Sequence, residues 1–256
     1  MLAIDVGNTE TVLGLFDADR LVGSWRITTR TERTADELEL VIRSLLRRHD
    51  PASFGRVGIA SVVPPFTPVL VQAISQLGCA ATLIDATTPL PIRLDVDEPL
   101  TVGADRIVNT LGASRLYARD TIVVDLGTAT SFDCITGDGT FIGGVIAPGV
   151  LTGAETLVRR TAKLPRVDLE APPTVIGRRT ESVLRSGIFY AAVESVDGIV
   201  RRIRDEWQRP DAYVVATGGL APLIAPHCRT VQHVEPALTL HGLRFALDAL
   251  EAASRR

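Results

Sequence analysis

The sequence has few cysteines and few histidines among its 256 residues. The three cysteines, Cys79, Cys134 and Cys228, lie far apart and form no C-x-x-C pair. Such a set is typical of buried free thiols in a reducing cytoplasm rather than of a disulfide framework. The four histidines are just as scattered. Because a zinc site needs closely spaced ligands, the sequence predicts no such site.

Long apolar runs and a strong net charge are also missing. No window approaches the roughly 20 apolar residues of a membrane span, and the N-terminus lacks the basic start of a signal peptide. The formal net charge is −3, which argues against a general nucleic-acid surface. With 46% hydrophobic and 22% charged residues, the chain is typical of a globular protein. We expect a cytoplasmic protein with neither a membrane nor a nucleic-acid partner.

What the sequence does contain is an internal repeat. Residues 2–25 and residues 121–144 both read as strand, tight turn, strand, turn and strand. A single offset of 120 residues aligns the two segments. The aligned pairs are Asp5 with Asp125, Gly7 with Gly127, Leu21 with Phe141, and Gly23 with Gly143.

Helices and buried strands follow each copy of the repeat. A capping box at Thr34 and Glu37 predicts a helix from Thr34 to His49. An apolar run predicts a buried strand over Val57–Val63, followed by a helix with Thr67 as its N-cap and Gly78 at its end.

In the second half, periodicity predicts a long helix over Glu181–Gln208 and a strand over Tyr213–Ala216. Leu151–Ile176 is expected to be a helix followed by a loop. The run Ile188–Ala192 is too apolar to pack on one sheet only, which favours a second surface such as a dimer interface.

Three antiparallel strands, then alternating helices and parallel strands, occurring twice, predict a duplicated ribonuclease H-like α/β fold of the actin-like type. We expect two mixed β-sheets flanked by helices, with a central cleft. The predicted domains are residues 1–118 and residues 119–256. In such folds, ligands bind where strand ends meet helix starts.

Paired acidic-glycine turns are the first chemical signal. Asp5-Val6-Gly7-Asn8-Thr9 could bring backbone N–H groups to phosphate oxygens, with Asp5 holding Mg²⁺ through water. Alone, this motif is better explained as a capped hairpin turn, but the matching turn at Asp125-Leu126-Gly127 shifts the balance. The sequence has no G-x-x-x-x-G-K-[ST] loop, which excludes that route to phosphate binding.

Gly103-Ala104-Asp105-Arg106 is the most distinctive tetrad and stands at a helix start. An aspartate there is favoured by the helix dipole whatever its function. Arg106 opposes the dipole, which indicates another role. The pair could deprotonate a hydroxyl and hold an anionic substrate.

Six segments together resemble type III pantothenate kinases, of the actin-like ATPase and sugar kinase superfamily, over nearly the whole chain. In order they are DVGNT at 5–9, SVVP at 61–64, GADRIVN at 103–109, VVDLGTATSFD at 123–133, GGVIAPGV at 143–150 and SGIFYAAV at 186–193. The resemblance implies ATP-dependent phosphorylation of pantothenate to 4′-phosphopantothenate, the first step of coenzyme A biosynthesis.

The resemblance also implies roles for individual residues. Asp105 would be the general base, and Asp125 would bind an activating monovalent cation, potassium or ammonium, beside the Mg²⁺ of ATP. Thr180 would reach the substrate, in a homodimer whose active site is shared. Val96 stands where many members of the family have a tyrosine in the pantothenate pocket. The expected ATP contacts are Asp5, Val6, Gly7, Asn8, Thr9, Glu10, Thr11, Val12 and Thr128, and the expected pantothenate contacts are Gly103, Ala104, Asp105, Arg106 and Thr180.

Two other readings stay open at this stage. The same fold serves kinases of other small hydroxylated substrates. Relatives of the family have also been described as non-catalytic transcriptional accessory factors. Loss of Asp5, Asp105 or Asp125 would favour that second reading, and all three are present.

Overall fold

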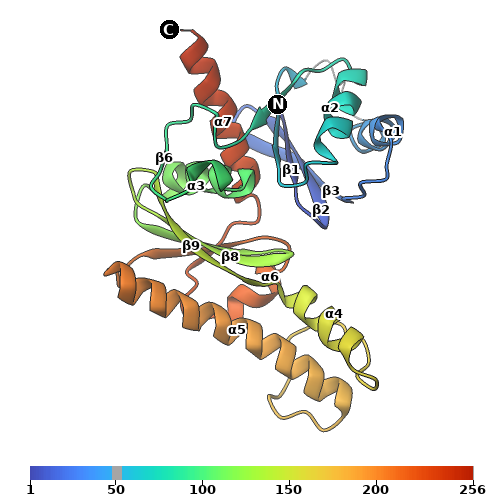
Figure 1. The fold of residues 1–256 in the computed structure, drawn as a ribbon, viewed down its shortest axis with the longest axis vertical. Helices are drawn as coiled ribbons and strands as arrows, with labels where there is room; N and C mark the ends of the chain where they lie inside the picture. Colours follow the sequence, from blue (N-terminus) through green and yellow to red (C-terminus); the bar gives the residue numbers. More distant parts are fainter. Residues whose placement is uncertain (48–53, 256) are drawn as a thin grey trace. The chain divides into compact units, whose positions relative to one another are not determined.

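The computed structural model describes residues 1–47 and 54–255 and divides into two compact units (Figure 1). Unit one comprises Met1–Leu116 and Leu238–Arg256, and unit two comprises Tyr117–Ala237. The first division between the units, between Leu116 and Tyr117, lies close to the boundary expected between residues 118 and 119. The C-terminal residues differ from that expectation, because they group with unit one rather than with the second half.

Unit one contains a mixed sheet with the strand order β3-β2-β1-β4-β5. The pairs β1–β2 and β2–β3 are antiparallel, whereas β4 and β5 run parallel to β1. Its elements are β1 Leu2–Val6, β2 Glu10–Asp17, β3 Arg20–Thr28, α1 Ala35–Leu45, β4 Val57–Ser61, α2 Thr67–Gln76, β5 Ala81–Ile84, β6 Arg93–Leu94, a 3₁₀ turn Pro99–Thr101, α3 Ala104–Tyr117 and α7 Leu238–Ser254.

Unit two repeats the plan, with its strands in the order β11-β10-β7-β8-β9. Again the first three strands along the chain pair antiparallel, and the next two run parallel to the first of them. The predicted duplicated α/β fold is therefore confirmed. Its elements are β7 Thr121–Leu126, β8 Ala129–Ile135, β9 Thr140–Pro148, α4 Val150–Arg160, α5 Thr180–Trp207, β10 Tyr213–Thr217, α6 Ala221–Ile224, a 3₁₀ turn Ala225–His227 and β11 His233–Val234.

Strand pairing refines the offset between the two copies. The first and third strands of each sheet match at 120 residues, but the middle strand matches at 119, because the turn before β8 is one residue shorter. The loop after β8 is longer and restores the offset. The pairs that establish this are Ile4 with Leu13 and Leu13 with Trp25 in unit one, and Val124 with Phe132 and Phe132 with Val145 in unit two.

The two faces of the first sheet carry different helices, which Figure 1 shows on opposite sides of it. One face packs large buried side chains against α1 and α2. The other face has a row of small residues, Ala3 paired with Gly14 on one side and with Gly58 on the other. Leu240 and Leu247 of α7 lie on the two glycines, so that a Cβ on Gly14 would stand 2.7 Å from Leu240. These small residues let α7 lie close to the sheet.

Most predicted element ends agree with the structure. The capping box of Thr34 and Glu37 is present at the start of α1. His49, the predicted end of that helix, lies outside the described residues. Gly78 follows α2 with φ +80°, as expected of a glycine that ends a helix.

The predicted N-cap of α2 is wrong. Phe66 occupies the cap position, and Thr67 is already helical. The Thr67 hydroxyl hydrogen-bonds to Ser61 Oγ at 2.7 Å and to the Val63 carbonyl at 3.0 Å, so it ties the helix to the end of β4 instead of capping it.

In unit two, the long helix begins at Thr180 and ends at Trp207, and β10 extends to Thr217, each close to the prediction. The expected helix and loop over Leu151–Ile176 correspond to α4 and the irregular chain after it. Within residues 1–47 and 54–255, no helix has the length and apolar character required to cross a membrane.

Candidate active site

The turn between β1 and β2 contains the first predicted ATP contacts. Its backbone is closed by a hydrogen bond from the Gly7 N–H to the Glu10 carbonyl at 3.0 Å. Asn8, Thr9 and Glu10 are exposed at its tip, whereas Asp5 is half-buried at the end of β1. The turn therefore presents the neutral side chains of Asn8 and Thr9 to solvent, next to the Glu10 carboxylate, which pairs with Arg26 at 3.2 Å, and the Asp5 carboxylate lies behind them.

Two other predicted contacts in this segment point into the protein. Val6 is fully buried in the core of unit one. Thr11 is also fully buried, and its hydroxyl hydrogen-bonds to Thr29. Since a buried side chain cannot touch a nucleotide, these two residues can offer only backbone groups or support. Val12 is half-buried on the next position of β2.

The start of α3 lies at the same edge of the sheet as this turn. The Val62 N–H donates to the Val6 carbonyl at 3.1 Å, directly after β4. A Cβ on Gly103 would lie 3.4 Å from Val62, which places the tetrad Gly103–Arg106 beside the carboxyl ends of β1 and β4. Ligands of open α/β sheets bind at such an edge.

Asp105 sits in the first turn of α3, next to buried Ala104. Its Oδ1 accepts a hydrogen bond from the Arg106 N–H at 2.8 Å. Burial raises the pKa of the Asp105 carboxyl above its ordinary value, while that N–H and the Arg106 guanidinium act in the opposite direction. A carboxyl with a raised pKa is a stronger base when it is ionised.

The helix that carries Asp105 is held by α7. The buried Asn109 Oδ1 accepts a hydrogen bond from the Thr239 hydroxyl at 2.9 Å. Gly242 lies so close to α3 that a Cβ there would stand 2.0 Å from the Val108 carbonyl. Asn109 belongs to the segment GADRIVN that contains Asp105, but no local sequence pattern marks its contact with α7.

In unit two, Asp125 occupies the position on β7 that Asp5 occupies on β1. The following turn is closed by the Gly127 N–H, which donates to the Ala129 carbonyl at 3.0 Å. Gly218, directly after β10, has φ +89°, and a Cβ there would lie 2.4 Å from Asp125 Oδ1. Only glycine leaves room for this carboxylate, which explains one glycine of the Gly218-Gly219 pair.

Thr128, the remaining ATP contact predicted in unit two, is exposed at the tip of this turn. Its carbonyl accepts a hydrogen bond from the Thr152 hydroxyl at 2.7 Å. A Cβ on Gly149 would lie 2.0 Å from the same carbonyl. The start of α4 is therefore pressed against the turn.

Thr180 is the first residue of α5, and it lines a cavity of about 530 Å³ between α4, α5 and the sheet of unit two. The turn region contributes Leu126, Pro148 and Gly149 to the same cavity. The structure thus brings Thr180 to one cavity with the end of β7. No group of three or more His, Cys, Asp or Glu residues that could hold a metal ion occurs in the part of the chain that is described.

The sequence matches the family model of type III pantothenate kinase over residues 1–202. The chain belongs to the type III pantothenate kinase family. It is 44% identical to type III pantothenate kinase 1 of Symbiobacterium thermophilum, over 97% of this chain and 96% of that protein. It is 45% identical to a type III pantothenate kinase of Desulfosudis oleivorans, over 98% of this chain and 100% of that protein.

Solved structures that are more distant in sequence share the fold of this family member. A crystal structure described as that of a Baf family transcriptional activator from Campylobacter jejuni has a TM-score of 0.59 and 18% identity, covering 98% of this chain and 100% of that one. The activator of 2-hydroxyisocaproyl-CoA dehydratase from Clostridium difficile, with bound ADPNP, has a TM-score of 0.53 and 12% identity, covering 100% and 96%. At these identities the likeness concerns the fold alone.

Proposed function

We propose that this chain transfers the γ-phosphoryl group of ATP to the hydroxyl of pantothenate, giving 4′-phosphopantothenate, the first step of coenzyme A biosynthesis. The observation that carries the proposal is the full-length relationship to type III pantothenate kinases. Asp5, Asp105 and Asp125, whose loss would favour a non-catalytic factor, are all present.

Asp105 is the general base. It accepts the proton of the substrate hydroxyl, and the raised pKa of its half-buried carboxyl suits that task. Arg106, the next residue on α3, attracts the carboxylate of pantothenate. Gly103 and Ala104 let the substrate approach the helix start closely. Phosphoryl transfer depends mostly on such positioning and on charge stabilisation.

The turn Asp5–Val12 and Thr128 bind ATP, with Mg²⁺ held by the phosphates and by Asp5. The absence of a three-residue metal cluster in the described part of the chain fits this assignment, since Mg²⁺ is usually bound by one or two carboxylates and the substrate phosphates. Bound there, Mg²⁺ would neutralise charge on the phosphates.

Asp125 binds a monovalent cation, potassium or ammonium. The half-buried carboxylate of Asp125 near the carboxyl end of β7, beside the exposed turn 127–129, supports this assignment. The cation would offset repulsion between this carboxylate and ATP. We expect sodium and lithium to substitute poorly, because their smaller radii fit a potassium-sized site badly.

The chain forms a homodimer through unit two, and Thr180 contacts pantothenate bound to the other protomer. Phe189 is fully buried in its own unit, and of the predicted run Ile188–Ala192 only Ala191 is exposed. The exposed face of α5 follows a four-residue spacing, with apolar side chains of α4 beside it. These residues are Val183, Gly187, Ala191 and Ser195 on α5, and Leu151 and Leu157 on α4.

A partner covering this face would reach Thr180, which lines the same cavity. The test is complementation between Asp105→Asn and Thr180→Ala chains. If Thr180 acts on the other protomer, mixed dimers have one intact site and recover activity toward half that of the wild type. If recovery is absent although subunits exchange, Thr180 acts within its own chain.

We assign the reaction to the cytoplasm, because all three cysteines are free thiols. The test of the function is a coupled ADP-release assay with and without pantothenate, in potassium and again in sodium buffer. Pantothenate-dependent release in potassium is expected. A panel of other small hydroxylated compounds serves as control. ADP release with one of them but not with pantothenate would mean that this compound, and not pantothenate, is the substrate.

A further inference from the structure

Thr29 follows the end of β3 and reaches back to the turn between β1 and β2. Its hydroxyl donates to the Gly7 carbonyl at 2.7 Å, and its backbone N–H donates to the Thr9 carbonyl at 2.9 Å. Behind it, Thr11 Oγ1 lies 2.9 Å from Thr29 Oγ1. One residue therefore holds the turn at two points.

The direction of these hydrogen bonds is determined by counting hydrogens. A threonine hydroxyl has one hydrogen to donate. Because Thr29 gives its hydrogen to the Gly7 carbonyl, the bond between the two hydroxyls must be donated by Thr11. The result is a chain from Thr11 through Thr29 to the backbone of the turn, and buried Thr11 orients the Thr29 hydroxyl.

Fixing the Gly7 carbonyl also fixes the next N–H group. In a trans peptide, the C=O of one residue and the N–H of the next point in opposite directions. The peptide that joins Gly7 to Asn8 therefore directs the Asn8 N–H away from Thr29. Asn8 is exposed, and none of the described residues accepts a hydrogen bond from this N–H. It is presented outward, as a phosphate oxygen would require.

We propose that Thr29 is a positioning residue of the ATP site, which acts through the Gly7 carbonyl to aim the Asn8 N–H at a phosphate of the nucleotide. Thr11 supports it from the core. The proposal rests on the proposed function, because it takes the turn as the ATP site. Neither residue touches the nucleotide through its side chain.

The test compares Thr29→Val with Thr29→Ser and Thr28→Val. Valine keeps the shape of threonine but removes the hydroxyl, whereas serine keeps the hydroxyl. Thr28 is the exposed neighbour of Thr29 at the end of β3 and is the matched control. For Thr29→Val we expect the KM and the Kd for MgATP to rise about 10-fold, the value of one hydrogen bond. The KM for pantothenate should stay within twofold, and both Thr29→Ser and Thr28→Val should resemble the wild type.

Amide exchange of the turn provides a readout that needs no activity. Exchange over residues 7–10 should accelerate in Thr29→Val and not in Thr28→Val. Wild-type MgATP affinity and unchanged exchange in Thr29→Val would overturn the proposal. If the wild type binds MgATP but phosphorylates no pantothenate, the substrate assignment fails, and weaker MgATP binding by Thr29→Val would still support the role of Thr29.

Discussion

The two acidic-glycine turns occupy equivalent positions in the two units but are held in different ways. The first turn is one residue longer, closed from Gly7 to Glu10, and a side-chain hydroxyl of Thr29 fixes it. The second is closed from Gly127 to Ala129, and the residue equivalent to Thr29 is Gly149, whose backbone lies directly against the Thr128 carbonyl. Duplication kept the carboxylate in place and changed its surroundings.

Both turns expose three consecutive residues at the tip, Asn8–Glu10 in the first and Gly127–Ala129 in the second. Their charged side chains differ, because the first tip ends on Glu10, which pairs with Arg26. The second turn follows a carboxylate, that of Asp125, which lies directly against Gly218. A second asymmetry is α7, which follows unit two in sequence yet packs in unit one and holds the helix of Asp105. The helix that carries the proposed base, Asp105, is thus supported by α7.

The largest effect is expected from Asp105→Asn, which keeps the shape of the side chain but removes the proton acceptor. Turnover should fall by about 10²-fold or more, with MgATP binding retained. Steady-state kinetics and calorimetric MgATP titration measure the two quantities. Asp19→Asn, at an exposed hairpin position of the same unit, is the control. If turnover stays within a few-fold of the wild type, Asp105 is only a residue at a helix start.

The same variant gives a pH-dependent stability difference. Because burial raises the pKa of Asp105, the folded state binds its proton more tightly than the unfolded state does. The ionised carboxyl therefore costs stability above its folded pKa, and this cost shrinks as the pH falls below that pKa and is gone below the unfolded pKa. Asp105→Asn should melt at a higher temperature than the wild type near neutral pH, and the gap should shrink on acidification. A gap that widens would contradict the assigned direction.

Next in size is Gly218→Ala, which tests the special packing of the second turn. A Cβ there meets Asp125 Oδ1 at 2.4 Å and the backbone of Leu126 at 2.7 Å. We expect at least a 10-fold loss of turnover in potassium, through displacement of the carboxylate. Gly78→Ala is the matched control, since Gly78 has a similar φ of +80° but no atom within 4 Å of its added Cβ. Equal activity in both variants would remove Gly218 from the cation site.

A smaller effect, on stability, is expected from Gly242→Ala in α7. The added methyl would overlap the Val108 carbonyl of α3, and overpacking of this kind costs about 1–3 kcal/mol. Gly198→Ala in α5 is the control, because its Cβ meets only one side-chain atom, at 4.0 Å. Thermal melting should show a loss for Gly242→Ala and none for Gly198→Ala. Equal melting temperatures would mean that α7 does not hold α3 closely.

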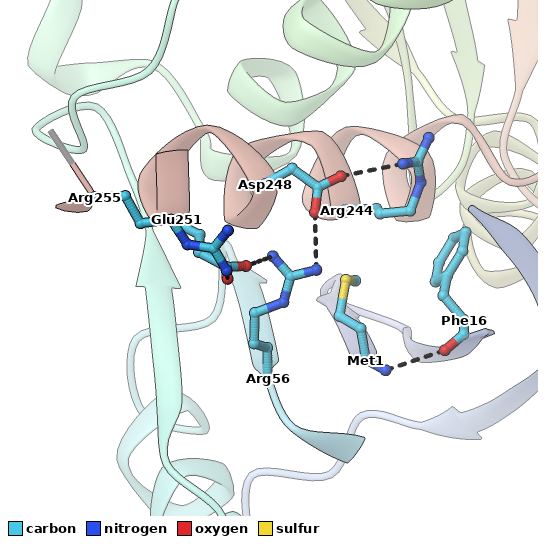
Figure 2. Close-up of polar contacts among 7 residues, drawn as sticks. All are labelled: Met1, Phe16, Arg56, Arg244, Asp248, Glu251 and Arg255. Carbon is cyan, nitrogen blue, oxygen red and sulfur yellow. Dashed lines mark hydrogen bonds and ion pairs between the residues drawn. The ribbon is translucent and has the colours of Figure 1, made fainter. Parts of the chain in front are cut away.

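The smallest effect is expected from Arg56→Gln, which removes the ion pairs that attach α7 to the start of β4 (Figure 2). Arg56 lies 2.8 Å from both Asp248 and Glu251 of α7. Asp248 also pairs with Arg244 of the same helix, and Glu251 pairs with Arg255, just past the end of that helix. These groups are part-exposed, so the loss should be about 1 kcal/mol or less and should shrink in high salt. A loss of stability that does not change with salt would indicate that packing of the aliphatic part of Arg56, rather than its charge, stabilises the contact with α7.

Local sequence signals predicted much of this molecule. The repeat, the capping box at Thr34 and the helix end at Gly78 each show in short stretches of sequence, and the structure contains all three. The placement of α7 was not, because it depends on the small residues Ala3, Gly14 and Gly58, which become a row only when three strands pair.

The sequence identified the candidate carboxylates of the site, but it did not identify the residues that hold the surrounding structure in place. The role of Thr29 and the bond from Thr239 to Asn109 join residues far apart in the chain, and no local pattern marks them. The proposed dimer face shares only Ala191 with the predicted run Ile188–Ala192, and the dimer itself stays a prediction. A continuous apolar run cannot tell which residues face the sheet, and Phe189 does.

The central claim is that these two unlike turns serve one reaction, phosphoryl transfer to pantothenate. The most direct test is to incubate the purified chain with γ-labelled ATP, Mg²⁺, potassium and pantothenate, and to follow the label by mass spectrometry. The label should appear in a phosphate ester of pantothenate, at a rate lowered by Asp105→Asn and by Gly218→Ala. Label that stays in ATP, or that appears only in inorganic phosphate, would contradict the account.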